Sequence, residues 1–258
     1  MRRALVLVAL GVAVAGCGGA KSDPVALAAE KTSHVATARF NINMTIRDPQ
    51  QGSLDFHGPG IIAAHGHVMW IKATLPAKEV GAPGKGDVRM EMLMTDKAMY
   101  FRGASFRPLL KPGKTWVEIR SRTPELGQND PGAMLLYLRA TSKLHRLRQT
   151  NVNGMQTTQY SVRTEIQKAL DLAKPADRKR LEGSAKQLKA AGIKEVPFDV
   201  WIDNSGYVRR LVIDWKVAGG AIVGKMDFSG FGTARSIAVP RQSQVVDVTS
   251  LAQDGGLP

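Results

Sequence analysis

The chain has 258 residues and a formal net charge of +14, and its composition is 43% hydrophobic and 22% charged. This composition is typical of a folded globular protein and argues against disorder of the low-hydrophobicity kind. A single cysteine cannot form an internal disulfide framework or a multi-cysteine zinc or iron–sulfur site, so an ordinary apolar core must hold the fold together.

Residues 1–16 have the pattern of an export signal. Two arginines precede the apolar run 4–13, which is too short to span the roughly 30 Å hydrocarbon core of a membrane. The residues from Val14 to Cys17 resemble the lipobox of bacterial lipoprotein signal peptides, with Val14 where leucine is usual. The resemblance implies that 1–16 are a lipoprotein signal peptide and that Cys17 carries the lipid. The alternative is an ordinary secretory signal that happens to contain a cysteine.

A short tether and one folded domain are expected after this signal. Residues 17–24 include a Gly/Ser-type segment typical of flexible tethers, and no later segment has 18 apolar residues in succession. Removal of 1–16 takes away two positive charges and no negative one, so the net charge falls from +14 to +12. We therefore predict a single domain over 25–258 that a lipid anchor holds at the extracytoplasmic face of the cell membrane.

Alternating apolar and polar residues predict antiparallel strands in most of the chain. The segments 35–47 and 88–94 show the period of two expected of a strand with one solvated face. The Asn-Gly pair at 153–154 and the turn residues 203–206 each separate two strand-like runs, which predicts hairpins. Consecutive hairpins of this kind predict one antiparallel meander. Further strands are expected over 221–231 and 243–248.

Helical patterns are fewer. Asp-Pro pairs precede the runs 25–31 and 132–141, which places an N-cap and a proline at the start of each predicted helix. The second of these runs is unusually apolar. A third helical region covers 164–191, and Pro175 interrupts it. Strands and helices together predict the α+β fold class.

The order of these segments resembles the actinobacterial LppX/LprAFG lipoproteins, which are relatives of the LolA/LolB lipoprotein carriers. The resemblance covers roughly residues 25–250, and its most specific pieces are residues 158–160 after the Asn-Gly turn and the hairpin 200–206. Neither piece is a catalytic motif. The resemblance implies a single strongly curved antiparallel sheet, a half-barrel, whose concave face is covered by helices. It also implies a hydrophobic cavity, which in better-known members holds acyl chains of lipids or lipoglycans.

The methionines are compatible with such a cavity. Six of the ten lie between positions 44 and 99, and the flexible thioether of methionine adapts to varied apolar partners. The alternative is a merely methionine-rich core, because an apolar stripe at strand spacing is normally the buried face of a sheet. We expect the apolar segment 134–138 to gate the cavity. The candidate lining residues are Phe40, Ile42, Met44, Met90, Met92, Met94, Met134, Leu138, Phe198 and Val200.

Patterns of catalytic and metal-binding residues are weak. His57, His65 and His67 lie near one another in the sequence, but no further ligand follows at a recognisable spacing, so surface histidines are the simpler interpretation. The sequence lacks the G-x-S-x-G, H-E-x-x-H and phosphate-loop signatures. Asp199 and Asp203 fit a structural role at a turn better than an acid–base pair. We therefore predict no enzymatic activity, no metal site and no cofactor.

The basic surplus has two interpretations. Lysines and arginines cluster within 102–122, 139–148 and 174–189, and a solvated surface is the simplest explanation for each cluster. The alternative is attraction to anionic headgroups or acidic wall polymers, worth about 1 kcal/mol per basic residue close to an anionic surface. The export signal argues against nucleic acid as a partner.

Two functions follow from these observations. The first is a monomeric, membrane-anchored lipoprotein that binds acyl chains of a lipid or glycolipid in its cavity, for carriage or retention in the cell envelope. The second is a structural or interaction lipoprotein on the same fold, with a closed core and a basic surface that binds the wall or the membrane. Fold similarity by itself cannot decide between them.

Overall fold

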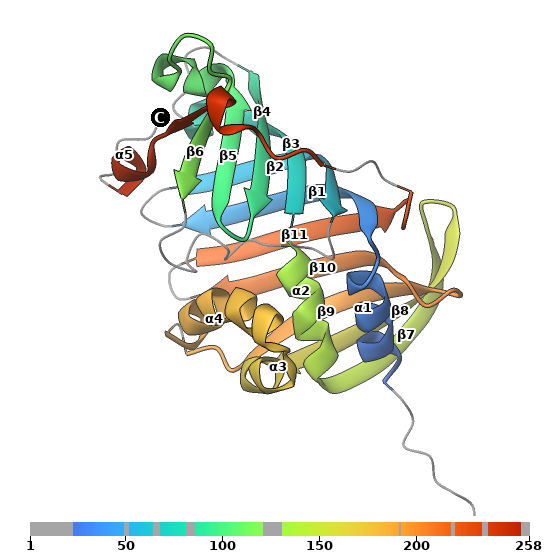
Figure 1. Cartoon of the computed structure of the whole chain (residues 1–258). Coiled ribbons are helices and arrows are strands. Elements are labelled where there is room, and N and C mark those ends of the chain that lie inside the picture. The colour runs from blue at the N-terminus through green and yellow to red at the C-terminus, as the bar shows by residue number, and fades with distance from the viewer. Residues whose placement is uncertain are drawn as a thin grey trace, which may run out of the picture.

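One open sheet of twelve strands, with helices packed on it, forms the framework of the molecule (Figure 1). The computed structural model describes residues 23–48, 52–63, 68–80, 86–120, 131–190, 192–217, 220–233 and 237–253. The predicted signal peptide, Cys17 and most of the tether lie outside the described residues, as do His65 and His67. In the part of the chain that is described, no helix is both long enough and apolar enough to cross a membrane.

The sheet consists of two antiparallel meanders that meet through their first and last strands. Strands β1–β6 pair consecutively, as do β7–β11, and β1 pairs with β11. The prediction of a single meander is therefore wrong, because hairpin signals identify only strands that are neighbours in the sequence. The strands are β1 (Thr37–Asp48), β2 (Gly52–Ala63), β3 (Val68–Pro76), β4 (Asp87–Thr95), β5 (Ala98–Gly103), β6 (Trp116–Arg120), β7 (Thr141–Val152), β8 (Met155–Glu165), β9 (Glu195–Asp203), β10 (Val208–Val217), β11 (Gly220–Ser229) and β12 (Val245–Asp247).

The predicted Asn-Gly hairpin is confirmed between β7 and β8. Asn153 has φ of 49° and Gly154 has φ of 83°, so both turn residues adopt the left-handed conformation that this dipeptide tolerates. The side chain of Asn151 accepts a hydrogen bond from the Gly154 backbone N–H, at 2.7 Å. The turn after β9 is confirmed as well, with Gly206 at φ of 77°.

The helices begin where the sequence places their caps and prolines. The Asp23 carboxylate accepts hydrogen bonds from the backbone N–H groups of Val25 and Ala26, at 2.8 and 3.1 Å, and so caps the first helix. The third helical region is shorter than predicted, because β8 continues to Glu165, and it splits before Pro175. The helices are α1 (Pro24–Ser33), α2 (Pro131–Tyr137), α3 (Ile166–Leu172), α4 (Pro175–Ala190) and α5 (Thr249–Gln253), and the short 3-10 helices are η2 (Ala77–Val80), η3 (Ala104–Leu109), η5 (Leu138–Ala140) and η6 (Gln242–Gln244).

Helices α1, α2, α3 and α4 gather on one face of the β8–β11 half of the sheet (Figure 1). Because side chains alternate between the two faces of a strand, Phe40, Ile42 and Met44 of β1 all point to that face. They share one buried cluster with Val25 of α1 and Leu138 of η5. Burial of each such large side chain contributes about 1.5–3 kcal/mol, so this cluster fixes the helices on the sheet.

The direction of the strands changes strongly along the sheet. In Figure 1, β4–β6 run steeply down the view, whereas β9–β11 run across it. A change of this kind is the accumulated twist of a many-stranded open sheet.

The C-terminal segment 237–253 wraps around the β6 edge of the sheet. Ile237 and Val245 pack in a cluster with Trp116, whereas Val248 packs with Val117. Trp116 and Val117 are adjacent in β6 and therefore point to opposite faces, so the segment contacts both faces of the sheet. Between these contacts, β12 pairs with β6 in the parallel direction.

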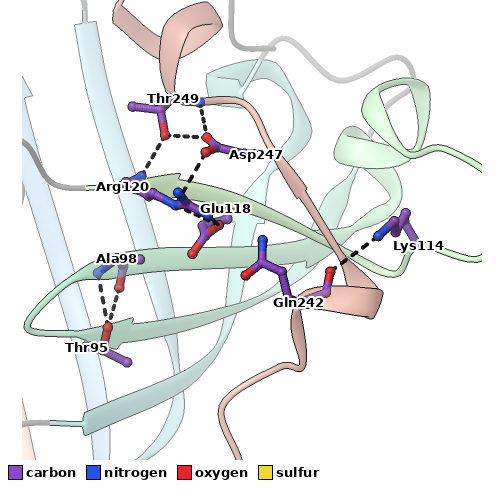
Figure 2. A network of polar contacts seen from close by, with 8 residues as sticks. All are labelled: Thr95, Ala98, Lys114, Glu118, Arg120, Gln242, Asp247 and Thr249. Carbon is purple, nitrogen blue, oxygen red and sulfur yellow. Dashed lines mark hydrogen bonds and ion pairs between the residues drawn. The ribbon is translucent and has the colours of Figure 1, made fainter.

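A polar network fastens this segment to β6 (Figure 2). The backbone N–H of Arg120 donates to Thr249 Oγ1 at 2.8 Å, and the Thr249 hydroxyl donates to Asp247 Oδ1 at 2.5 Å. The Arg120 guanidinium contacts both Glu118, at 3.1 Å, and Asp247, at 3.3 Å. The two carboxylates and the Thr249 hydroxyl thus fix the position of α5 relative to β6.

Candidate ligand cavity

A cavity of about 300 Å³ lies between the helices and the sheet. Its floor includes Ala38 of β1, Ile62 of β2 and Phe228 of β11, and Leu135 and Leu136 of α2 also line it. Ala38 pairs directly with Ile62, and Phe228 pairs with Phe40, which lies two positions after Ala38 on the same face of β1. The three floor residues therefore share one face of the sheet. The cavity volume is at the lower end of the range for small-molecule sites.

Most of the remaining lining is polar and comes from the ends of helices. It includes Thr32 and His34 at the end of α1, and Arg139 of η5. The corner between α3 and α4 adds Lys174 and Arg180. We call the side of the cavity formed by these helix ends the mouth, because the exposed side chain of Lys174 lies there. The lining therefore changes from apolar at the sheet to mostly polar at the mouth.

Arg139 joins three helical segments at this mouth. Its Nε lies 2.8 Å from Glu30 Oε2 of α1, and its Nη1 lies 3.3 Å from Asp177 Oδ2 of α4. Its Nη2 also donates a hydrogen bond to Ser33 Oγ at 2.6 Å. The Arg139 side chain is 14% exposed, so these contacts are screened by water less than a surface ion pair. The network holds the ends of α1 and α4 together beside η5.

Tyr137 forms a second link, between α2 and α4. Its hydroxyl lies 2.8 Å from Ser184 Oγ, and the Ser184 hydroxyl donates to the Leu181 carbonyl at 3.1 Å. Either hydroxyl can donate in the contact between Tyr137 and Ser184. Burial raises the pKa of Tyr137 above its usual value near 10, and the hydrogen bond to Ser184 opposes this rise. The link holds the helix that lines one wall of the cavity.

The ten residues predicted to line a cavity are not among those that line this one. Seven of them are buried in the core cluster around it, namely Phe40, Ile42, Met44, Met134, Leu138, Phe198 and Val200. Met90, Met92 and Met94 of β4 are half-buried, and they pair with Ala73, Ile71 and Met69 of β3. A cavity lined by any of the ten stays a prediction. Alternation identifies the correct face of a strand, but it does not show which position is left unfilled.

Sequence reasoning missed Ala38 and Ile62 as lining residues. Ala38 belongs to the same alternation as Phe40, but the candidate lining residues included only larger side chains. A small residue among bulky ones on the same face of a strand is the pattern that could have indicated this cavity. Protein cores are closely packed, so the volume that alanine does not fill must be filled by another element or left as a cavity.

Other polar residues singled out from the sequence have separate places. Asp203 is buried at the β9–β10 turn, where its carboxylate accepts from the Tyr207 backbone N–H at 3.0 Å and pairs with Arg209. Its predicted structural role is confirmed. Asp199 is half-buried in β9, and His57 is exposed on β2. Among the described residues, no group of three or more His, Cys, Asp or Glu side chains lies together as a metal-ligand set.

Comparison with known sequences gives one distant relative. No family model matches the chain. An uncharacterized 31.2 kDa protein of the rplA-rplJ intergenic region of Streptomyces griseus is 23% identical over 139 residues, which cover 54% of this chain. The match spans 43% of that protein, which is less than half of its length.

Comparison with solved structures gives lipoproteins. LprF from Mycobacterium bovis has 15% identity and a TM-score of 0.47, and the match covers 84% of this chain and 95% of LprF. LppX from Mycobacterium tuberculosis has 15% identity and a TM-score of 0.46, covering 84% of this chain and 100% of LppX. A LolA superfamily protein from Nitrosomonas europaea has 12% identity and a TM-score of 0.32, covering 83% of this chain and 93% of that protein.

The chain is similar to LppX- and LprF-type, LolA-like lipoproteins. The resemblance stated from the sequence is to the same lipoproteins. At these identities and TM-scores, the similarity transfers no ligand and no residue role to this chain.

Proposed function

We propose that this protein is a membrane-anchored lipoprotein that holds acyl chains of a lipid or glycolipid in the cavity, for carriage or retention in the cell envelope. The observation that carries the proposal is the apolar floor and wall formed by Ala38, Ile62, Phe228, Leu135 and Leu136 around a space of about 300 Å³. Space left out of a core lowers the stability of a protein. A cavity with an apolar lining is therefore better explained by an apolar ligand than by a role in folding.

The volume agrees with part of an acyl chain. A water molecule occupies about 30 Å³ in the liquid, and a methylene group is of similar size, so the cavity accommodates roughly ten methylene groups. At about 0.8 kcal/mol for each buried methylene, such a segment gains roughly 8 kcal/mol before the costs of ordering the ligand and the protein are subtracted. Binding would thus depend on shape and apolar area more than on hydrogen bonds.

In this proposal the sheet is a half-barrel, and the helices cover its concave face. Helix α2 is the gate, because Leu135 and Leu136 line the cavity and the Tyr137 link to α4 holds them there. Cys17 would carry the lipid anchor, and the chain would enter the folded part at Asp23, next to α1. The similar protein LppX is itself a lipoprotein, which is compatible with an anchor on this chain.

Native mass spectrometry tests the proposal. The full chain with Cys17→Ala, which removes the proposed acylation site, is produced in a bacterium and purified without detergent. Co-purification of an acyl lipid is the expected result. A protein that carries no lipid, and that takes up none from added vesicles, would contradict the proposal and favour a structural or interaction lipoprotein instead.

Two variants locate the bound chain. Ala38→Phe places a large side chain at the floor of the cavity, whereas Met92→Trp enlarges a half-buried residue on the same sheet that does not line this cavity. We expect Ala38→Phe to lower lipid occupancy several-fold and Met92→Trp to leave it unchanged. The opposite result would place the lipid against β4 and overturn the assignment of the site to this cavity.

A further inference from the structure

We infer that Met69, Met94 and Met99 form a site for a soft monovalent cation, Cu(I), whose ligands are the three thioether sulfurs. The inference goes beyond the proposed function and is independent of it, because the three side chains do not line the cavity. The histidine pattern of the sequence predicted no metal site. A thioether site emerges only in the structure, since strand pairing brings the three methionines together.

The three methionines form one row across neighbouring strands. Met69 of β3 pairs directly with Met94 of β4, and Met94 pairs directly with Met99 of β5. Directly opposite side chains point to the same face of a sheet, with their Cβ atoms about 4.5–5.5 Å apart. Each sulfur lies near the end of a flexible, unbranched side chain, so the two outer sulfurs can turn toward the one on the central strand. The row thus offers three sulfur ligands to one ion at Met94.

The β4–β5 hairpin fixes the positions of two of these ligands. Met94 and Met99 form the last direct pair before its turn. At the turn, the Thr95 hydroxyl donates to the Ala98 carbonyl at 3.0 Å and accepts from the Ala98 backbone N–H at 3.1 Å (Figure 2). The two backbone segments that carry Met94 and Met99 are therefore held in register before an ion binds, which lowers the cost of ordering the site.

The burial of the row suits an ion that enters from one side. Met69 is 2% exposed, whereas Met94 and Met99 are half-buried. The row continues with an isoleucine at each end, because Ile62 pairs with Met69 and Ile119 pairs with Met99. The sulfurs therefore lie between apolar side chains, and the exposed parts of Met94 and Met99 leave them accessible to an ion.

The chemistry of these ligands selects the ion. A thioether is soft and uncharged, which favours Cu(I), whereas Mg²⁺ and Ca²⁺ take oxygen ligands. Neutral ligands leave the charge of the ion uncompensated, and burial of charge is costly, so a monovalent ion is favoured over a divalent one. Unlike the thiolate and imidazole ligands of other metal sites, a thioether has no proton to lose, so the affinity should not depend on pH.

Competition with the chromophoric Cu(I) chelator bicinchoninate, in ascorbate and without oxygen, measures the affinity. The protein is the full chain with Cys17→Ala, which removes its only thiol. We expect one bound Cu(I) per chain. The affinity should stay the same from about pH 8 to about pH 5, the range in which imidazole ligands become protonated.

Two variants assign the ion to the row. Met94→Leu removes the central ligand and keeps a similar side-chain volume, so the fold should be retained. Loss of even an outer-shell partner lowers metal affinity about 10- to 100-fold, and we expect a loss of at least this size. Met90→Leu is the matched control, because Met90 is half-buried on the same face of β4 but pairs with Ala73 and Gly103. It should leave the affinity unchanged, and circular dichroism should show both variants folded.

NMR of selectively labelled methionine methyl groups locates the ion directly. Ag(I) serves as an air-stable substitute for Cu(I). We expect Ag(I) to shift the methyl resonances of Met69, Met94 and Met99 and to leave that of Met90 in place.

Several results would overturn the inference. One is the absence of Cu(I) binding, and another is an affinity that falls with acidification, which would place the ion on imidazole ligands. Equal losses in the Met90 and Met94 variants, or no loss in either, would also overturn it. None of these results bears on lipid binding, which the mass spectrometry of the Cys17→Ala protein tests separately.

Discussion

The Glu30 carboxylate of α1 lies 2.8 Å from Nε of Arg139 in η5, although 108 residues lie between Glu30 and Arg139 in the sequence. The same guanidinium contacts Asp177, so one side chain connects η5 with the end of α1 and the start of α4. These segments surround the mouth of the cavity. The spacing of the helices around the mouth therefore depends on a polar network as well as on the apolar core.

Replacement of Arg139 by methionine keeps the apolar stem and removes this network. We expect Arg139→Met to lower the free energy of unfolding by about 1–3 kcal/mol, because Asp177 and Ser33 lose a charged partner in a largely buried place. Urea unfolding followed by circular dichroism measures the change. The mouth should also open more readily, which hydrogen exchange in α1 would report.

Arg178→Met is the control for this prediction. Arg178 pairs with Glu182 at 3.5 Å, but both side chains are about half exposed, at 46% and 52%. An exposed pair of this kind contributes little, and the Arg178 guanidinium also donates a hydrogen bond to the Leu170 carbonyl at 3.3 Å, so the control should lower the stability by about 1 kcal/mol or less. Equal losses in the two variants would show that the Arg139 network has no special role.

Tyr137→Phe should make the protein less stable at neutral pH but less sensitive to alkali. The hydrogen bond to Ser184 contributes about 1 kcal/mol, and this is lost at neutral pH. The pKa of Tyr137 is raised by burial, so the unfolded chain loses this proton at lower pH than the folded protein does. The contribution of the buried phenol to stability is therefore complete below about pH 10 and is lost as the pH rises through the folded pKa.

The measurement is urea unfolding from pH 7 to about pH 11, with Ser184→Ala as the control. Ser184→Ala removes the same hydrogen bond and keeps the phenol, so it should lose stability at neutral pH and retain the alkaline loss. If Tyr137→Phe and the parent protein lose stability equally above about pH 10, titration of Tyr137 does not control the alkaline unfolding.

Local features of this fold could be predicted from the sequence, because short-range physics determines them. The cap at Asp23 and the turn at Asn153–Gly154 are set by residues within a few positions of each other. The face of β1 that carries Phe40 follows from alternation alone. In each case the chain needs no information from distant segments.

Long-range pairing could not be predicted in the same way. The neighbours β1 and β11 are about 180 residues apart in the chain, and no turn signal marks their register. The parallel pairing of β12 with β6 has no hairpin signal at all. The cavity also depends on packing between distant segments, because its space arises where Ala38 faces α2 instead of a bulkier side chain. Alternation predicted the buried face but not the gap in it.

Thr249→Val should release the C-terminal segment from β6 with little effect on the rest of the fold. The hydroxyl accepts from the Arg120 backbone N–H and donates to Asp247, and valine keeps the shape but does neither (Figure 2). We expect faster hydrogen exchange over 245–253 and a global stability loss of about 1 kcal/mol or less. Exchange measured by mass spectrometry compares this segment with β9, which should stay unchanged. Uniformly faster exchange throughout the sheet would show that the network stabilises the whole fold.

Gly60→Ala should disturb the core beside the cavity floor. A Cβ at Gly60 would lie 2.2 Å from Cζ of Phe40, whose ring covers this glycine from the neighbouring strand. The buried ring cannot move freely, so overpacking should cost about 1–3 kcal/mol in urea unfolding.

Phe40→Leu removes the ring atoms that clash and destabilises the protein by itself through lost burial. In the Phe40→Leu background, Gly60→Ala should therefore be nearly neutral, and the double-mutant cycle should give a coupling energy of about 1 kcal/mol or more. Additive effects would mean that the ring does not restrict position 60. The strain would then have to arise in the backbone of β2, and the wall next to Ile62 would not depend on Phe40.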